Sequence, residues 1–172
     1  IPSGGFLIVW ASGRNEVADG HYHAGFRLTQ TKADPDWIVL SDAGGVILDR
    51  VQLETTQTNH SRGLAPNGGE SWAIFTAPTP GYTNNSSTAY ARYAAAAVVS
   101  DSAGFYPSPL SIVITTTEPN GSIKYTTDGT LPVSSSSTYT VPVSIMTTKI
   151  LKARVFSSDP SVLPGFVEFN TY

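Results

Sequence analysis

The sequence of 172 residues contains no cysteine, and only 13% of its residues are charged. Without cysteine, disulfide bonds, thiolate metal sites and thiol redox chemistry are excluded. No apolar run approaches the roughly 20 residues that cross a bilayer, so direct membrane insertion is not expected. Lysine and arginine together number ten and form no cluster, and we therefore expect no nucleic-acid partner.

The residues that are present favour β-structure. Hydrophobic side chains make up 40% of the chain, and threonine, which favours strands, is frequent. Short apolar or alternating runs are separated by turns rich in Gly, Pro, Asn and Asp. This pattern is typical of an all-β protein built from small sandwiches.

The segment 37–51 is central to this organisation. Two apolar runs flank a turn that contains Asp42, Gly44 and Gly45. Glycine supplies the positive φ that a tight connection needs, and aspartate can accept hydrogen bonds from its own backbone. The segment therefore predicts a β-hairpin. Further strands of the first half are predicted at residues 6–12, 23–29 and 71–75, and loops at residues 13–20 and 62–69.

The first half of the chain, about residues 1–85, resembles the lamin-tail domain, an immunoglobulin-like β-sandwich. The matching residues are Phe6-Leu7-Ile8-Val9-Trp10-Ala11, His23 with Phe26-Arg27-Leu28, Ile38-Val39-Leu40-Ser41-Asp42 with Gly45, Leu48, Asp49 and Val51, and Pro78-Thr79-Pro80-Gly81 with Asn84. Gly25 stands where the family usually has Asn. The first strands of the family pattern are missing, which implies a fragment that begins within that domain and has an unprotected sheet edge.

A linker is predicted near residues 86–95. Residues 84–87 are polar, and residues 89–97 are rich in alanine, which permits a helical turn or two. Close packing of residues 94–97 would make the connection rigid, whereas a loose 84–87 segment would make it a hinge. After the linker, strands are predicted at residues 111–115, 123–126, 139–145 and 151–155.

The second half, roughly residues 95–172, resembles the chitobiase/β-hexosaminidase C-terminal-type module. The matching residues are Gly104-Phe105-Tyr106-Pro107-Ser108-Pro109, the run from Ile123 to Pro132 that includes Tyr125-Thr126-Thr127-Asp128-Gly129, and Leu151-Lys152-Ala153-Arg154. The resemblance implies another immunoglobulin-like accessory domain of exported proteins. It implies no hexosaminidase activity, because the catalytic machinery of such enzymes lies in other domains.

Aromatic residues are the main candidates for ligand binding. Trp10, Trp37 and Trp72 lie in strand-like runs, and we expect them to pack in the core instead of forming a sugar platform. The better exposed candidates are four tyrosines around the linker, Tyr82, Tyr90, Tyr93 and Tyr106. These tyrosines could bind a ligand or pack the two modules against each other.

Residues with catalytic or metal-binding chemistry have simpler explanations. His21 and His23 would share one strand face, but His23 falls where the lamin-tail pattern often carries a histidine without metal, so no metal is expected. Asp42, Asp49 and Asp128 are expected to bond nearby backbone. Residues 69–73 resemble a nucleophile elbow, but the second glycine is missing and a strand is expected to follow.

The sequence therefore predicts an all-β chain of two immunoglobulin-like β-sandwich domains in tandem. Residues 1–85 form the first domain, residues 86–95 the linker and residues 96–172 the second domain. The expected function is a non-catalytic adhesion or scaffolding pair, with a carbohydrate-binding accessory module as the alternative. The expected partners are other domains of a larger exported or cell-surface protein, a surface protein or a polysaccharide. No cofactor is expected.

Overall fold

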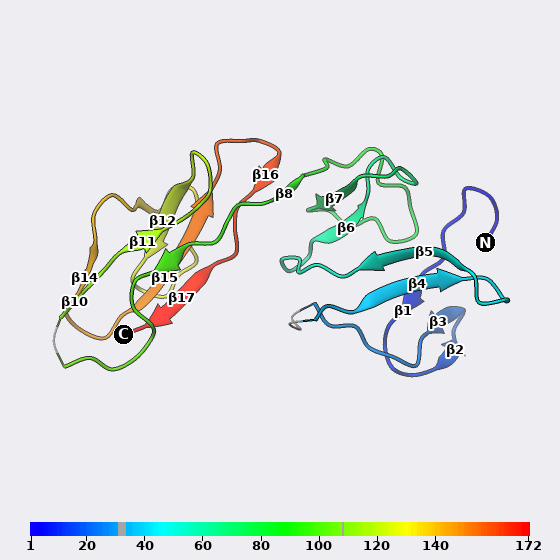
Figure 1. The fold of residues 1–172 in the computed structure, drawn as a ribbon, viewed down its shortest axis with the longest axis horizontal. Helices are drawn as coiled ribbons and strands as arrows, with labels where there is room; N and C mark the ends of the chain where they lie inside the picture. The colour runs from blue at the N-terminus through cyan, green and yellow to red at the C-terminus, as the bar shows by residue number, and fades with distance from the viewer. Residues whose placement is uncertain (31–33, 108) are drawn as a thin grey trace. The chain divides into compact units, whose positions relative to one another are not determined.

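The computed structural model describes residues 1–30, 34–107 and 109–172. These residues form β-strands joined by turns and contain no helix (Figure 1). Accordingly, no helix suited to crossing a membrane occurs among them. The chain divides into two compact units, which we call unit 1 (Ile1–Thr88) and unit 2 (Ala89–Tyr172). The prediction of an all-β chain is confirmed.

The first sheet of unit 1 has three short strands in the order β1–β3–β2. They are β1 (Val9–Trp10), β2 (Glu16–Ala18) and β3 (His21–His23). Asp19 and Gly20 join β2 to β3, and their φ angles of 52° and 77° are those that a two-residue type I′ turn requires. The predictions of a loop at 13–20 and a strand at 23–29 are therefore wrong in part. The Asp-Gly pair forms a hairpin turn, so β2 lies within the predicted loop and β3 begins at His21, before the predicted strand.

The predicted hairpin at 37–51 is confirmed. β4 (Trp37–Ser41) and β5 (Ile47–Gln52) pair antiparallel, with a register shift between Leu40 and Ser41. The Asp42 carboxylate accepts hydrogen bonds from the amides of Gly44 and Val46, each at 2.9 Å. Gly45 follows at a φ of 83°. The aspartate and the glycine thus close the turn as expected from their chemistry.

A second hairpin completes unit 1. β6 (Ser61–Leu64) pairs antiparallel with β7 (Trp72–Phe75), so the predicted strand at 71–75 is confirmed, and the predicted loop at 62–69 begins later than expected. Among the described residues of unit 1, the buried apolar side chains are three residues of β7, Ala73, Ile74 and Phe75. Unit 1 therefore has a small core, and most of its apolar side chains remain in contact with solvent.

Unit 2 is built around a four-stranded antiparallel sheet in the order β13–β12–β15–β17. Its strands are β12 (Ser122–Thr126), β13 (Ser137–Thr138), β15 (Ile150–Phe156) and β17 (Glu168–Thr171). Three further strand pairs surround this sheet: β9 (Val98–Val99) with β11 (Ile114–Thr115), β10 (Leu110–Ile112) with β14 (Val143–Ile145), and β8 (Arg92–Tyr93) with β16 (Val162–Leu163).

The core of unit 2 follows from strand alternation. Leu151, Ala153 and Val155 on β15 are at most 1% exposed, whereas the lysine and arginine between them are half-buried. Ile112 and Ile114 pack in the same cluster. Each large apolar side chain removed from water contributes roughly 1.5–3 kcal/mol. The predicted strand at 151–155 is confirmed, and unit 2 has the more extensive core.

The alanine-rich segment forms no helix. Ala94 and Ala97 are buried in the core of unit 2, and the amide of Ala94 donates to the carbonyl of Leu163 at 2.8 Å. A Cβ added at Gly165 would lie 2.9 Å from the carbonyl oxygen of Ala94. Small side chains at these positions therefore allow two backbone segments to approach closely, and this packing overrides the helix propensity of alanine.

Candidate functional site

The four candidate tyrosines lie in different surroundings. Tyr82 belongs to unit 1 and is 76% exposed, whereas the other three belong to unit 2. Tyr90 and Tyr93 are half-buried, and the ring of Tyr93 packs edge-on against Phe166 with centroids 4.9 Å apart. Tyr106 is 41% exposed and lies 6.2 Å from the ring of Tyr172. The four tyrosines therefore lie in different local environments.

Tyr106 lines a cavity of about 240 Å³ at one end of unit 2. The hydroxyl of Tyr106 donates to the carbonyl of Ser102, and the hydroxyl of Tyr172 donates to the carbonyl of Asp101, both at 2.7 Å. These bonds fix both rings, and burial of Tyr172 raises the pKa of its phenol. The other lining residues are Phe105, Pro107, Pro109, Leu110, Ile145, Met146, Thr147 and Thr148.

This aromatic cavity has the chemistry of an amphipathic binding site. Phe105 is fully exposed and Met146 is 76% exposed, so apolar side chains face solvent at its rim. Thr147 and Thr148 add hydroxyl groups. An apolar ring face beside hydroxyls suits a ligand with one apolar and one polar side, such as a sugar. The sequence pointed to Tyr106 but not to Tyr172, which lies 66 residues further along the chain.

The three tryptophans are not in a core, contrary to the prediction. Trp10, Trp37 and Trp72 are 49%, 51% and 38% exposed. The guanidinium of Arg50 lies 5.5 Å from the ring centre of Trp37, and that of Arg62 lies 4.9 Å from the ring centre of Trp72. The prediction is wrong because unit 1 has few buried apolar residues against which these rings could pack. The arginines also cover ring faces that a sugar would need.

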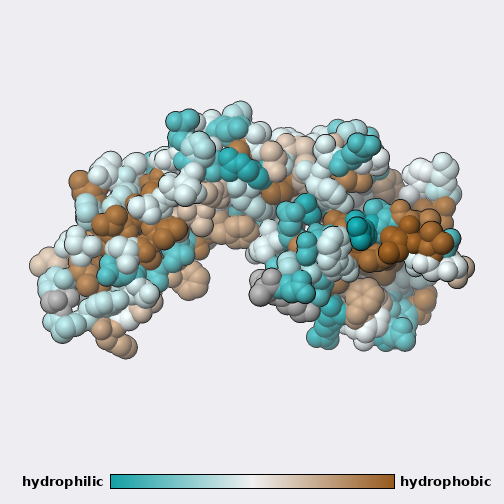
Figure 2. All heavy atoms as spheres, viewed as in Figure 1, coloured by the Kyte–Doolittle hydropathy of each residue, from teal (hydrophilic) through white to brown (hydrophobic). Residues whose placement is uncertain are grey.

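Both strands of the β4–β5 hairpin carry exposed apolar side chains. We call the following seven residues the hairpin surface: Trp37, Ile38, Val39, Leu40, Val46, Ile47 and Leu48. Each is between 41% and 63% exposed. Figure 2 shows hydrophobic atoms gathered over this hairpin in unit 1. The charged residues of the two strands are Asp49 and Arg50, both on β5.

Both histidines of β3 contact neighbouring side chains. His21 is exposed and its ring packs edge-on near Trp10 at 6.5 Å. His23 is half-buried, and its Nδ1 is hydrogen-bonded to the hydroxyl of Ser12 at 3.0 Å. In the described ranges of the chain, no three His, Cys, Asp or Glu side chains lie together as metal ligands would.

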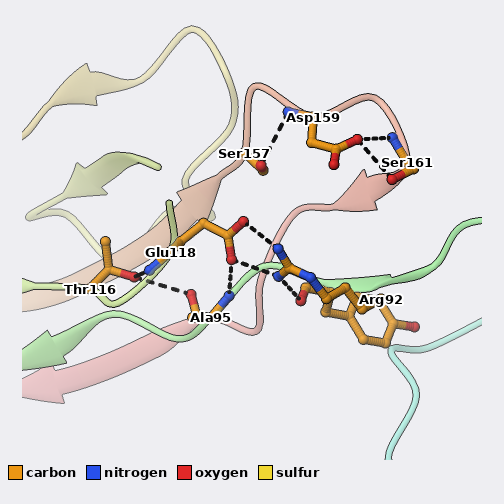
Figure 3. A network of polar contacts seen from close by, with 8 residues as sticks. Arg92, Ala95, Thr116, Glu118, Ser157, Asp159 and Ser161 are labelled. Atoms are coloured by element: carbon orange, nitrogen blue, oxygen red, sulfur yellow. Dashed lines mark hydrogen bonds and ion pairs between the residues drawn. The ribbon is translucent and has the colours of Figure 1, made fainter. Parts of the chain in front are cut away.

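A partly buried ion pair in unit 2 was not predicted (Figure 3). The side chain of Glu118 is 2% exposed, and both of its carboxylate oxygens accept hydrogen bonds from Arg92, at 2.7 and 2.9 Å. The amide of Ala95 donates to the same carboxylate at 2.9 Å. These bonds lower the pKa of Glu118 to about 2, with the Arg92 bond the largest cause. Glu118 is therefore an anion at ordinary pH and cannot act as a general acid.

The aspartates that the sequence assigned to turns bond nearby backbone, as predicted. The carboxylate of Asp128 accepts bonds from the amide and hydroxyl of Thr130 at 3.0 and 2.7 Å, and these bonds lower its pKa. Asp49 accepts from the amide of Arg50 at 2.7 Å. A strand follows Ser71, as β7 begins at Trp72, so the structural context of a nucleophile elbow is lacking.

In the comparison with known proteins, one part of the chain matches a family model. No curated protein and no solved structure matches it. The run Tyr125-Thr126-Thr127-Asp128-Gly129, which carries the resemblance of the second half, lies on β12 and the turn after it. Residues 101–161, which lie in unit 2 and include β10 to β15, match the family model of the Chitobiase/beta-hexosaminidase C-terminal domain.

Proposed function

We propose that the chain is a non-catalytic accessory pair of β-domains from a larger exported protein, and that unit 1 makes the protein contact. The family matched by residues 101–161 is an immunoglobulin-like, carbohydrate-binding accessory module that typically occurs in secreted glycosidases. In this proposal residues 1–85 are a lamin-tail-like domain, 86–95 the linker and 96–172 the accessory module. The partners are other domains of the parent protein or a surface protein.

The hairpin surface is the observation that carries this proposal. A pure spacer has no need of a large exposed apolar patch, whereas contact surfaces commonly have one. Here seven neighbouring apolar residues of one hairpin are each at least 41% exposed. The Glu118 carboxylate is held ionised by Arg92, so it cannot supply the proton that the general acid of a glycosidase gives to the leaving group.

Turnover of chromogenic glycosides tests the non-catalytic part. The chain should release no more nitrophenol than buffer from the p-nitrophenyl glycosides of N-acetylglucosamine, glucose and galactose. Glu118→Gln serves as the matched variant, because Glu118 is a buried carboxylate of unit 2. Turnover by the chain that is lost in this variant would overturn the proposal.

A second candidate function is carbohydrate binding at the aromatic cavity. It is favoured by the placement of Phe105, Tyr106 and Tyr172 around a cavity of about 240 Å³. Pull-down on insoluble chitin, cellulose and starch tests it. Binding that is lost in Phe105→Ala and Tyr106→Ala but kept in Tyr82→Ala, an exposed tyrosine of unit 1, would support it. Absence of binding to all three polymers would exclude it for these glycans.

A further inference from the structure

One edge of the β4–β5 hairpin is open in the described part of unit 1. β4 forms a two-stranded sheet with β5 and with no other described strand. The amide of Leu53 donates to the carbonyl of Asp36 at 2.9 Å, which fixes the alternation of the ladder. By that alternation, the backbone groups of Trp37 and Val39 point away from β5. Such an edge is a template for another strand.

We infer that two copies of this chain associate through β4, paired antiparallel with a two-fold axis at Val39. This inference rests on the proposed contact function and names a second copy as the partner. In this register the outward-pointing backbone groups of Val39 bond those of Val39 in the second copy, and those of Trp37 bond those of Ser41. The side chains of Ile38 and Leu40 lie on the opposite face of the sheet, where Ile38 of one copy lies opposite Leu40 of the other. The two hairpins then form one four-stranded antiparallel sheet.

Charge selects β4 over β5 for this pairing. Residues 37–41 of β4 carry no charge, so their apolar side chains meet apolar or neutral side chains in the two-fold register. A full-length pairing through β5 would place its two-fold axis at Asp49 or at Arg50. Either choice sets identical charges opposite each other, which destabilises a strand pair. A second copy therefore fits the β4 edge better than the β5 edge.

The apolar side chains of β4 also offer a substantial part of the area that a dimer needs. Trp37, Ile38, Val39 and Leu40 are 41–57% exposed and leave on the order of 400 Å² of surface on β4. A standard interface buries about 800 Å² of each partner. An isologous dimer covers the same strand on both copies, so β4 provides about half of that area.

Sedimentation equilibrium of the whole chain tests the inference. We expect a mass of twice 18.2 kDa at high concentration and dissociation on dilution. Val39→Lys should weaken association at least tenfold, because it sets two lysines against each other at the axis. Val46→Lys is the matched control, since Val46 is 62% exposed and lies in the turn outside the β4 ladder. A dimer that persists unchanged in V39K would overturn the pairing through β4.

A mixture of two charge variants shows whether charge repulsion or misfolding causes the loss of the dimer. V39K and V39D should each be monomeric, and an equimolar mixture should recover the dimer because lysine then faces aspartate across the axis. A mixture that stays monomeric, from variants with native circular dichroism, would contradict the two-fold at Val39. Added salt should strengthen the wild-type dimer, because this register brings Asp36 near Asp42 of the second copy.

A monomeric wild type would overturn self-association but need not overturn the contact function. Fluorescence of 1-anilinonaphthalene-8-sulfonate separates these cases. Strong dye binding that falls in Leu40→Lys means that the hairpin surface is open and contacts a partner other than a second copy. A monomer that binds no dye means that the surface is not exposed, and the contact function fails with the dimer.

Discussion

Arg92 holds Glu118 through both terminal nitrogens of its guanidinium, at 2.7 and 2.9 Å, across 26 residues of sequence. The amide of Ala95 donates to the same carboxylate, so this contact fixes the start of unit 2 against the loop that precedes β12. Arg92 remains half exposed while Glu118 is buried. The pair therefore acts as a structural clamp whose strength depends on the charge of Glu118.

Acid should weaken unit 2 through this clamp. The pKa of Glu118 falls from 4.5 to about 2 on folding, so its stabilising contribution is complete above pH 4.5 and is lost as the pH falls through 2. Glu118→Gln should lower the melting temperature at pH 7 and flatten its decline between pH 4.5 and 2. Circular dichroism melts at several pH values measure this.

The exposed ion pair of unit 1 provides the control for the acid experiment. Glu54 bonds Arg62 at 2.6 Å, but its side chain is 65% exposed. Surface pairs of this kind contribute little to stability. Glu54→Gln should therefore leave both the melting temperature and its pH dependence nearly unchanged. An equal effect of the two substitutions would mean that Glu118 is not buried in solution.

Gly165→Ala should destabilise unit 2 by about 1–3 kcal/mol, because the new Cβ would lie 2.9 Å from the backbone oxygen of Ala94. The carbonyl oxygen of Gly165 also accepts a hydrogen bond from the Arg154 guanidinium at 2.8 Å, so the backbone of Gly165 has little freedom to move. Urea unfolding measures the change. Gly104→Ala is the control, since its Cβ would meet nothing closer than 3.5 Å. A neutral Gly165→Ala would contradict the close packing of the alanine-rich segment.

Truncation of apolar side chains should affect the two units very differently. Ile112 is 0% exposed in the core of unit 2, so Ile112→Ala should cost about 2–5 kcal/mol. Leu48 is 63% exposed on the hairpin surface, and Leu48→Ala should change the free energy of unfolding by no more than about 0.5 kcal/mol. Urea unfolding at low protein concentration measures both. A cost above 1 kcal/mol for Leu48→Ala would show that this side chain is covered in solution.

The sequence predicted best where a local pattern determines the structure. The strand at 151–155 was predicted from a short run of neighbouring residues, and the Asp42 turn followed from the backbone-bonding chemistry of aspartate and glycine. The Asp19-Gly20 turn had the same kind of signal and was missed because its two flanking strands are only three residues long. Local patterns are sufficient when the strand and its turn are contiguous in sequence.

Prediction from the sequence failed where contacts between residues far apart in the chain determine the structure. Apolar strand runs suggested buried tryptophans, but burial requires a second layer of side chains, and unit 1 buries apolar side chains mainly on β7. The pairing of Arg92 with Glu118 and of Tyr106 with Tyr172 depends on chain topology, which no short motif encodes. The lamin-tail resemblance of the first half stays a prediction, whereas that of the second half is supported by the family match at 101–161.

Tryptophan fluorescence should report on unit 1 alone, because Trp10, Trp37 and Trp72 all lie there. Since each ring is at least 38% exposed, acrylamide should quench the dilute monomer nearly as well as it quenches the chain in urea. Quenching should decrease at concentrations where the chain dimerises, because pairing through β4 covers part of Trp37. Trp37→Phe should remove that dependence, and Trp72→Phe should keep it. Strong protection of the dilute monomer would mean that the hairpin surface is closed in solution.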